Sequence, residues 1–445
     1  MENYTPGADV VIIGGGLSGL SAAAFLTEKG KRVLLLEAAQ HTGGRARSFA
    51  DSYFPDPIDN GQHIMMGCYK ETFRFLKLIG SYHKLDFQPS LSVPFILPDQ
   101  TIEYLRADGT LYPFNLLTGF LRFRLLSLKD RLRILRLFSS LLFIRKNSTA
   151  GLTVYQWLKS NGQSEQLIAS FWEILCIGAL NVSPLKAPAE LFIEILKQMF
   201  LTGNRSSTIV LPGTDLSNLF GSGASNYICS NGGAIELSAR VLRLEREGDH
   251  IRRIILNNNK VISGFKHVIC AIPPYSLCRI TGGILNNIPE FAYSPIVSLH
   301  IALSRPCTQL REKYYSLPGS PVHWIFNHNS YISTVTSGAD EWKGLTAAEI
   351  QEIVIGELCK YIPGFNTEDI LNIRVIREKR ATVVFDNETT ALRPGAVTDV
   401  KNLFLAGDWT NTGLPATIEG AVKSGRIAAQ TVTGIMQTVA SAPAR

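Results

Sequence analysis

Residues suited to binding a dinucleotide gather near the start of the chain, around a glycine-rich turn. Residues 14–19 read GGGLSG, which fits the spacing G-x-G-x-x-G, and the strand-like run 9–13 directly precedes them. In such a turn Gly14 permits the tight bend, Gly16 lets the backbone approach a pyrophosphate, and Gly19 lets a helix pack closely on a strand. The pattern predicts a phosphate-binding turn rather than an ordinary glycine-rich loop.

An acidic residue follows at the distance that a ribose-binding carboxylate requires. A helix is expected from Ser18 to Lys29, and a second apolar strand over 33–36 leads into Glu37. This residue lies roughly 20 positions beyond the glycines, where a carboxylate hydrogen-bonds the ribose. The helix would offer unpaired N–H groups and its positive dipole end to the phosphates. The residues predicted to bind the dinucleotide here are Gly14, Gly16, Ser18, Gly19, Glu37 and Ala38.

A second glycine turn helps to choose between dinucleotides. Residues 41–47 read HTGGRAR and follow the second strand within a few positions. This Gly-Gly-Arg resembles the signature of the superfamily of flavin amine oxidases and phytoene desaturases. The resemblance implies FAD rather than NAD, with Gly44 bringing backbone to the diphosphate and Arg45 beside the flavin half. The alternative is that these arginines only decorate a surface loop.

The segment 59–69, DNGQHIMMGCY, makes the resemblance more specific. Together with the run 211–220 (LPGTDLSNLF) it looks like hydroxysqualene dehydroxylases, the squalene-associated branch of the phytoene desaturase-like flavoproteins. In related folds the chain crosses the flavin ring here, which implies that Gly61 gives backbone clearance and that Gln62 and His63 face the substrate. His63 is the candidate catalytic residue because an imidazole holds a proton near neutral pH. The alternative is a residue that braces the loop.

A third signature lies near the end of the chain. The run 402–406 leads into Gly407 and Asp408, and a long helix is expected to begin near Thr417. By resemblance, the Asp408 carboxylate meets the ribityl chain of FAD, and the backbone of Val241 meets the adenine. A helix that starts near Thr417 would direct its positive dipole end at the flavin pyrimidine, where charge gathers on reduction. The alternative is an ordinary strand–helix crossover.

Length and composition bound the class of protein. At 445 residues the chain exceeds the size at which one core keeps growing, so about two domains are expected. Its seven cysteines include no C-x-x-C pair, which indicates a reducing compartment and no metal site. The first strand begins too early for a signal peptide, and no apolar run is long enough to span a membrane. A cytoplasmic protein is therefore expected, and the modest net charge of +7 does not lead us to expect a nucleic-acid partner.

The segments between these signatures show the pattern of short strands, which differs from the buried apolar strands described above. Residues 89–112 and 293–386 read as short strands with a helix near 347–361, and 237–256 reads as a β-meander. The resemblance implies an α/β fold, with a Rossmann-type FAD-binding domain like that of glutathione reductase and an inserted α+β substrate domain. The expected FAD-binding domain comprises 1–88, 206–290 and 387–445, and the expected substrate domain comprises 89–205 and 291–386.

The stretch 116–146 is basic and amphipathic. It carries one acid, Asp130, and eight basic residues: Arg122, Arg124, Lys129, Arg131, Arg133, Arg136, Arg145 and Lys146. Five leucines at spacings of four and three predict one helical stripe: Leu121, Leu125, Leu128, Leu132 and Leu135. A basic amphipathic helix suits an anionic membrane surface. A helix that packs on the core and leaves its arginines in solvent fits the same pattern.

Further helices are expected at 152–162, 165–180 and 188–202. Four of their aromatic residues suit the wall of an apolar tunnel, namely Phe171, Trp172, Phe192 and Phe200. Aromatic residues at helical spacing also form ordinary core, so the pattern leaves both readings open.

The resemblance implies that bound reduced FAD converts hydroxysqualene to squalene, in the supply of hopanoid-type triterpenes. The expected partners are a long-chain isoprenoid substrate, a membrane surface and a separate electron donor, since the chain has a single dinucleotide fingerprint. Three alternatives stay open: oxidation of a carotenoid precursor as in phytoene desaturases, amine oxidation, and a prenyl-lipid carrier without chemistry. The flavin signatures argue against the carrier, which needs no flavin.

Overall fold

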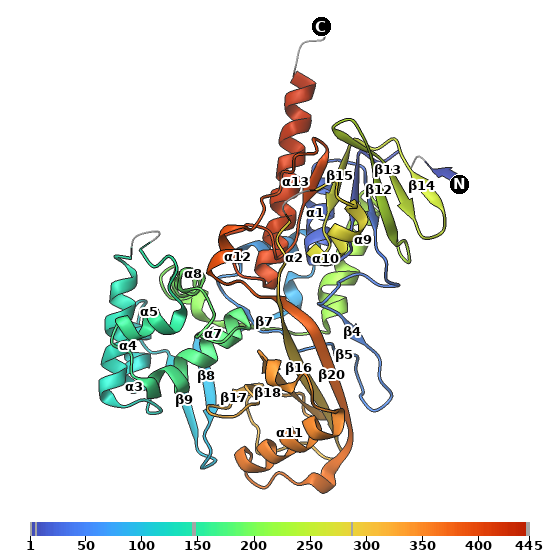
Figure 1. Ribbon diagram of the computed structural model, residues 1–445. Helices are drawn as coiled ribbons and strands as arrows, with labels where there is room; N and C mark the ends of the chain where they lie inside the picture. Colours follow the sequence, from blue (N-terminus) through green and yellow to red (C-terminus); the bar gives the residue numbers. More distant parts are fainter. Residues whose placement is uncertain (1, 5–6, 145–147, 286–287, 442–445) are drawn as a thin grey trace.

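A five-stranded parallel sheet forms the centre of one half of the molecule (Figure 1). The structure is a computed structural model and describes residues 2–4, 7–144, 148–285 and 288–441. The strand order is β11 (Ala234–Glu236), β3 (Val33–Leu36), β2 (Val10–Ile13), β15 (His267–Cys270) and β21 (Leu403–Leu405). β2 and β3 are apolar and fully buried, as strands are when both faces of a parallel sheet are covered.

Helices α1 (Leu17–Glu28) and α13 (Ile418–Ser441) pack against each other beside this sheet (Figure 1). Small residues permit their close approach, since a Cβ built on Gly425 would lie 2.1 Å from the carbonyl oxygen of Ser18. α9 (Gly223–Ser230) packs on α1 as well. The helix expected at 18–29 is confirmed, within one residue at each end.

Two further sheets of four or more strands contain most of the remaining strands. The first has the order β1 (Glu2–Tyr4), β14 (Lys260–Ile262), β13 (His250–Leu256) and β12 (Val241–Glu247), and it contains the expected meander. The second, larger sheet has the order β20 (Ile370–Val383), β16 (Tyr293–Leu303), β19 (Tyr331–Ser337), β18 (Trp324–Asn327), β17 (Tyr314–Ser316), β8 (Leu91–Ile96) and β9 (Ile102–Ala107). Helix α11 (Ala347–Tyr361) packs on β20, at the position expected. The domain boundaries given above stay a prediction.

A group of helices, drawn in teal and green in Figure 1, lies at the β8–β9 end of the larger sheet. It comprises α3 (Phe114–Arg122), α4 (Leu128–Leu141), α5 (Val154–Ser160), α6 (Glu165–Leu167), α7 (Glu173–Leu180) and α8 (Ala189–Phe200). A π-helical turn over Ile168–Trp172 joins α6 to α7. The helices expected at 152–162, 165–180 and 188–202 are confirmed.

The single helical stripe expected over 116–146 is wrong, because the chain breaks into α3 and α4. Phe123 leaves the helix to become fully buried, and the Ser127 side chain then caps α4 by accepting a hydrogen bond from the Asp130 N–H at 3.2 Å. Two leucines of the stripe, Leu128 and Leu132, are 64% and 54% exposed. The buried residues of α4 are instead Asp130, Ile134, Leu137 and Leu141. Arg145 and Lys146 lie outside the described residues.

Helix α2 (Lys70–Leu78) is fixed to the start of α13 by a buried carboxylate. Glu419 accepts hydrogen bonds from the N–H of Glu71 at 2.9 Å and from the N–H and hydroxyl of Thr72 at 2.8 and 2.7 Å. Further along α13, Arg426 pairs with Glu71 at 2.5 Å. The starts of α2 and α13 therefore lie together, which places the residues just before each helix side by side.

Short elements connect these layers. They are β4 (Ser48–Phe49), β5 (Ile58–Asp59), β6 (Met65–Met66), β7 (Leu85–Phe87), β10 (Ile209–Pro212), α10 (Pro274–Thr281) and α12 (Asn387–Ala391). β6 and β7 both pair with β10. This small sheet joins the segment after the second glycine turn to the segment that follows α8.

Candidate active site

The glycine turn after β2 leaves no room for side chains at two positions. Gly14 has a φ of +107°, and a Cβ there would lie 2.5 Å from the carbonyl oxygen of Ala271. A Cβ at Gly19 would lie 1.8 Å from the carbonyl oxygen of Gly14. Both positions require glycine because β2, α1 and the end of β15 approach one another closely here.

The start of α1 is open to an anion. Nothing lies within 4 Å of a Cβ built on Gly16, and no described side chain caps this end of the helix. The second glycine turn lies against it, since the N–H of Gly43 donates to the carbonyl oxygen of Gly15 at 2.8 Å and a Cβ at Gly44 would lie 3.1 Å from the Cα of Gly16. Unpaired N–H groups at a helix start bind anions, so this space fits a diphosphate.

Glu37 is held beside the same turn by two backbone groups. Its carboxylate accepts hydrogen bonds from the N–H of Gly15 at 2.6 Å and from the N–H of Ala39 at 2.7 Å. A carboxylate oriented in this way fits the ribose of a dinucleotide. The other residues predicted for this end are Ser18, buried in α1, exposed Ala38, and Val241 at the start of β12.

Arg45 and Asp408, which are far apart in the sequence, form an ion pair of 2.7 Å. Arg45 also donates to the carbonyl oxygen of Ala381 at 2.7 Å, and Asp408 is buried at the end of β21. Burial lowers the pKa of Arg45, but the Asp408 carboxylate outweighs it and raises the pKa above its ordinary value. The second and third signatures of the sequence therefore meet at one place.

The loop after Asp408 is organised by Arg393, a residue that the sequence analysis did not single out. Its buried guanidinium donates to the carbonyl oxygens of Leu414 at 2.8 Å and of Asp408 and Trp409 at 3.3 Å, and also to that of Thr410. Burial lowers its pKa to about 10, so the group stays cationic near neutral pH. No sequence motif identifies this residue. Its partners are backbone carbonyl groups, which are present in every sequence.

Two buried hydroxyl groups near these residues have no hydrogen-bond partner among the described residues. The Tyr293 hydroxyl lies within electrostatic reach of Arg45 and Asp408, and the Ser298 hydroxyl would lie 3.3 Å from a Cβ on Gly61. Buried polar atoms normally find partners. Polar atoms of a bound flavin would meet this need, so the residues present fit FAD.

His63 follows Gly61 and lies within electrostatic reach of Arg45. Its Nδ1 donates to the carbonyl oxygen of Gly61 at 2.7 Å, which leaves Nε2 as the second nitrogen, and the preceding Gln62 is half-buried. Burial, with a smaller effect of Arg45, lowers the pKa of His63. His63 does not itself contribute to the wall of the apolar pocket described next, although the next residue, Ile64, does.

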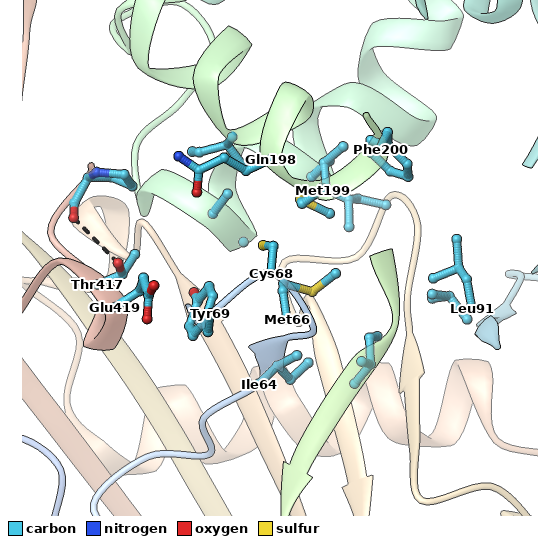
Figure 2. A pocket seen from close by; sticks show the side chains of 18 of the residues that line it. Ile64, Met66, Cys68, Tyr69, Leu91, Gln198, Met199, Phe200, Thr417 and Glu419 are labelled. Carbon is cyan, nitrogen blue, oxygen red and sulfur yellow. Dashed lines mark hydrogen bonds between the residues drawn. The ribbon is translucent and has the colours of Figure 1, made fainter. Parts of the chain in front are cut away.

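An apolar pocket lies between the helical group, the larger sheet and the start of α13 (Figure 2). Its wall includes Leu91, Val93, Phe95, Phe171, Met199 and Phe200. Of the four aromatic residues predicted to line a tunnel, Phe171 and Phe200 do so, whereas Trp172 and Phe192 are fully buried in the core beside it. The chemistry of this wall suits a hydrocarbon ligand.

Polar groups in this pocket gather toward one end. Figure 2 shows Tyr69, Thr417 and Glu419 together at the start of α13, with Leu91 at the opposite side. This end adjoins the loop that Asp408 begins. The sequence analysis named Thr417 but did not single out Tyr69 or Glu419. The signals available for them were that Tyr69 ends the segment 59–69 and that Glu419 lies two residues beyond the helix start expected near Thr417.

Comparison with known proteins agrees with this geometry. The model of the family "Flavin containing amine oxidoreductase" matches residues 17–433. A hydroxysqualene dehydroxylase of Sinorhizobium fredii is 30% identical, over 95% of this chain and 97% of its own length. One from Zymomonas mobilis is also 30% identical, over 94% and 97%. A 15-cis-phytoene desaturase of an Oncidium hybrid is 25% identical, over 95% of this chain and 77% of its own length.

Solved structures share the fold at lower identity. An oxidoreductase from Methanosarcina mazei has a TM-score of 0.72 at 20% identity and covers 96% of this chain and 99% of its own. A putrescine oxidase bound to putrescine has a TM-score of 0.71 at 14% identity, with 97% and 100% covered. The expected fold class is thereby confirmed.

We call the two glycine turns, Glu37, Arg45 and Asp408 the flavin cradle. Removing either of its carboxylates, that of Glu37 or that of Asp408, should weaken flavin binding. Asp408→Ala leaves Arg45 without its partner, and Glu37→Ala removes the group held at the ribose end, so each variant should raise the Kd for FAD at least about tenfold. Absorbance of the purified proteins and titration of the apoproteins with FAD measure this. Asp369→Ala, which breaks the exposed pair with Arg305, is the matched control and should keep its flavin. Full flavin content in both test variants would show that the cofactor is placed wrongly.

Proposed function

This chain belongs to the flavin-containing amine oxidoreductase family and is an FAD-dependent oxidoreductase, and from that premise we propose that it reduces hydroxysqualene to squalene. The observation that carries the proposal is the pocket, whose wall is mostly apolar and which gathers Tyr69, Thr417 and Glu419 toward the start of α13. A hydroxylated C30 hydrocarbon likewise combines a large apolar surface with a single polar group. Relatives named hydroxysqualene dehydroxylase, at 30% identity over nearly their whole length, support the same substrate.

The proposed reaction replaces a C–O bond by a C–H bond. The alcohol, one hydride and one proton give the hydrocarbon and water, so that two electrons enter the substrate. Reduced FAD supplies the hydride when it is bound. The chain itself must hold the alcohol with its oxygen at the polar end, deliver the proton to that oxygen and keep water from the reacting carbon; the apolar wall serves the last purpose.

We propose His63 as the source of the proton. It follows Gly61 in the segment beside Arg45, and it precedes Ile64, which lines the pocket. The bond from Nδ1 to the Gly61 carbonyl fixes the ring and leaves Nε2 to exchange the proton. Hydroxide is a poor leaving group, so a positioned acid accelerates the loss of the oxygen.

Oxidation of a carotenoid precursor is the second candidate. The similarity to phytoene desaturases and the apolar wall favour it, but at 25% identity those relatives are more distant than the dehydroxylases. In that reaction the electrons would leave the substrate and reduce the flavin. A carrier role leaves the flavin-binding residues unexplained, because a carrier needs no flavin.

We also propose attachment to an anionic membrane through the α3–α4 surface. We define this surface by exposed apolar residues (Leu111, Phe114, Leu128, Leu132, Leu142 and Phe143) and exposed basic residues (Arg122, Arg124, Lys129 and Arg136). Phe143 is 81% exposed and Phe114 63%, which is unusual for phenylalanine on a solvated surface. Apolar side chains flanked by arginines match the boundary between lipid headgroups and acyl chains. No described helix is long and apolar enough to cross a bilayer.

Under anaerobic conditions, the chemically reduced holoenzyme should convert hydroxysqualene to squalene. One molecule of squalene should form for each flavin that is reoxidised. Mass analysis of the products and flavin absorbance measure the two quantities. With NADPH in place of the chemical reductant little squalene should form, because the sequence has one dinucleotide fingerprint and we propose a separate electron donor. Absence of squalene, with desaturation of a carotenoid precursor by the oxidised protein, would favour the second candidate instead.

Loss of the His63 imidazole should lower kcat by about 10² to 10⁴ while leaving flavin content intact. Because burial lowers the pKa of His63, its acid form is scarce near pH 7, so the rate of the parent protein should rise as the pH falls toward that pKa. His63→Ala should lose this rise. His83→Ala removes an exposed histidine and should keep the parental profile. An unchanged rate in His63→Ala would mean that another group or an ordered water supplies the proton.

Replacing Arg122, Lys129 and Arg136 by Gln should weaken binding to anionic vesicles by roughly a hundredfold, since each basic residue near the surface contributes about 1 kcal/mol. Arg133 is left intact because it pairs with buried Asp130 at 2.7 Å. The control replaces three exposed arginines of the β12–β13 meander and its approach, Arg240, Arg246 and Arg252, which changes the net charge equally. If both triple variants lost vesicle binding equally, binding would depend on the total charge of the protein and not on the α3–α4 surface.

A further inference from the structure

We propose that the Tyr69 hydroxyl binds the oxygen of the alcohol substrate and thereby distinguishes the alcohol from its hydrocarbon product. The proposal rests on the proposed function and adds a specificity-determining residue to it. Tyr69 lines the pocket at its polar end, next to Thr417 and Glu419 (Figure 2). It is also the N-cap residue that directly precedes α2.

The backbone at Tyr69 is held in place by contacts of the residues before it and of the residues after it. Before it, β6 pairs with β10, and a Cβ on Gly67 would lie 1.7 Å from the carbonyl oxygen of Arg205, so the backbone there has no freedom to shift. After it, the N–H groups of Glu71 and Thr72 are held by the Glu419 carboxylate. A ring anchored in this way presents its hydroxyl at a constant place, as a recognition group must.

The other polar groups at this end are already engaged. The Glu419 carboxylate accepts three hydrogen bonds, and the Gln198 amide donates to the Glu194 carboxylate at 2.8 Å. The Thr417 hydroxyl donates to the Pro415 carbonyl oxygen at 3.4 Å and accepts from the N–H of Gly420 at 3.2 Å. The Tyr69 hydroxyl lies close to Thr417 and retains capacity for a further partner, because a phenol both donates and accepts.

Tyr69 is present as the neutral phenol throughout the physiological range. Burial, followed by Cys68 and Glu419, raises the pKa of Tyr69 above its ordinary value. The phenol therefore keeps both its proton and its oxygen lone pairs for hydrogen bonding with an alcohol. The Thr417 proton is directed to the Pro415 carbonyl, so it does not occupy the phenol oxygen.

A consequence for product release follows from this arrangement. The apolar wall holds the alcohol and the hydrocarbon chain alike, but only the alcohol offers an oxygen to Tyr69. A site built to hydrogen-bond a hydroxyl disfavours the analogue that lacks it, because the group of the site is left unpaired. Loss of the oxygen during the reaction therefore weakens binding of the product at the moment it forms.

Equilibrium binding to the oxidised holoenzyme tests this, since no turnover occurs there. Hydroxysqualene and squalene are each titrated into the protein, and the perturbed flavin absorbance reports the two Kd values. The parent protein should prefer the alcohol by about tenfold. Tyr69→Phe should bring the ratio close to one by weakening the alcohol only. Tyr361→Phe, which removes a buried hydroxyl bonded to the Pro318 carbonyl far from the pocket, should keep the parental ratio.

Each other outcome is decisive. If Tyr69→Phe kept the parental ratio of the two Kd values, the proposal would be overturned. Trp324 lines the pocket from β18 and carries its own N–H donor, so loss of the preference for the alcohol in Trp324→Phe would overturn it as well. If Tyr69→Phe loses its flavin, Tyr69→Leu provides a second side chain without a hydroxyl. Failure of the parent to bind either compound would refute the proposed function itself, whereas equal binding of both by the parent would refute only the role of Tyr69.

Discussion

The buried carboxylate of Glu419 is the contact on which both parts of the site depend. It accepts three hydrogen bonds from Glu71 and Thr72, and so joins the start of α13 to the start of α2. A carboxylate taken from water is unfavourable unless donors replace the water, and three do so here; burial still raises its pKa. Because α13 also packs along α1, one helix aligns the flavin cradle with the pocket wall.

A buried cation couples the same two regions from the other side. Arg393 donates to carbonyl oxygens at Asp408 and at Leu414, so it fixes both ends of the loop between them. Asp408 faces Arg45 in the cradle, whereas Leu414 lines the pocket. A planar guanidinium with five donors suits several carbonyl groups at once, which an ammonium group does not. The loop that connects Asp408 to the pocket wall is thus held by one side chain in the core.

The apolar pocket and the α3–α4 surface answer the same physical problem under the proposed function. A C30 substrate has little solubility in water, so it must leave a lipid phase and enter an apolar space without crossing solvent. The same group of helices presents apolar side chains on its outer surface and in the pocket. Helices α3 and α4 carry the exposed ones, and α7 and α8 contribute to the pocket wall. Three polar side chains, Tyr69, Thr417 and Glu419, gather beside the start of α13, where the proposed reaction would need them.

The sequence by itself determined the parts that rest on local backbone geometry. The glycines at 14, 16 and 19, Glu37 and the helix at 17–28 belong to one strand–turn–helix–strand unit, so their spacing along the chain sets their spacing in space. Tertiary structure alone decided the rest. The pocket gathers residues from 64–69, 91–105, 171–209, 324 and 414–419. Tyr69 and Glu419 meet groups from the other end of the chain, and Arg393 binds carbonyl oxygens 15 to 21 residues further along. The leucine stripe over 121–135 failed for the same reason, because burial of Phe123 in the core outweighs helical periodicity there.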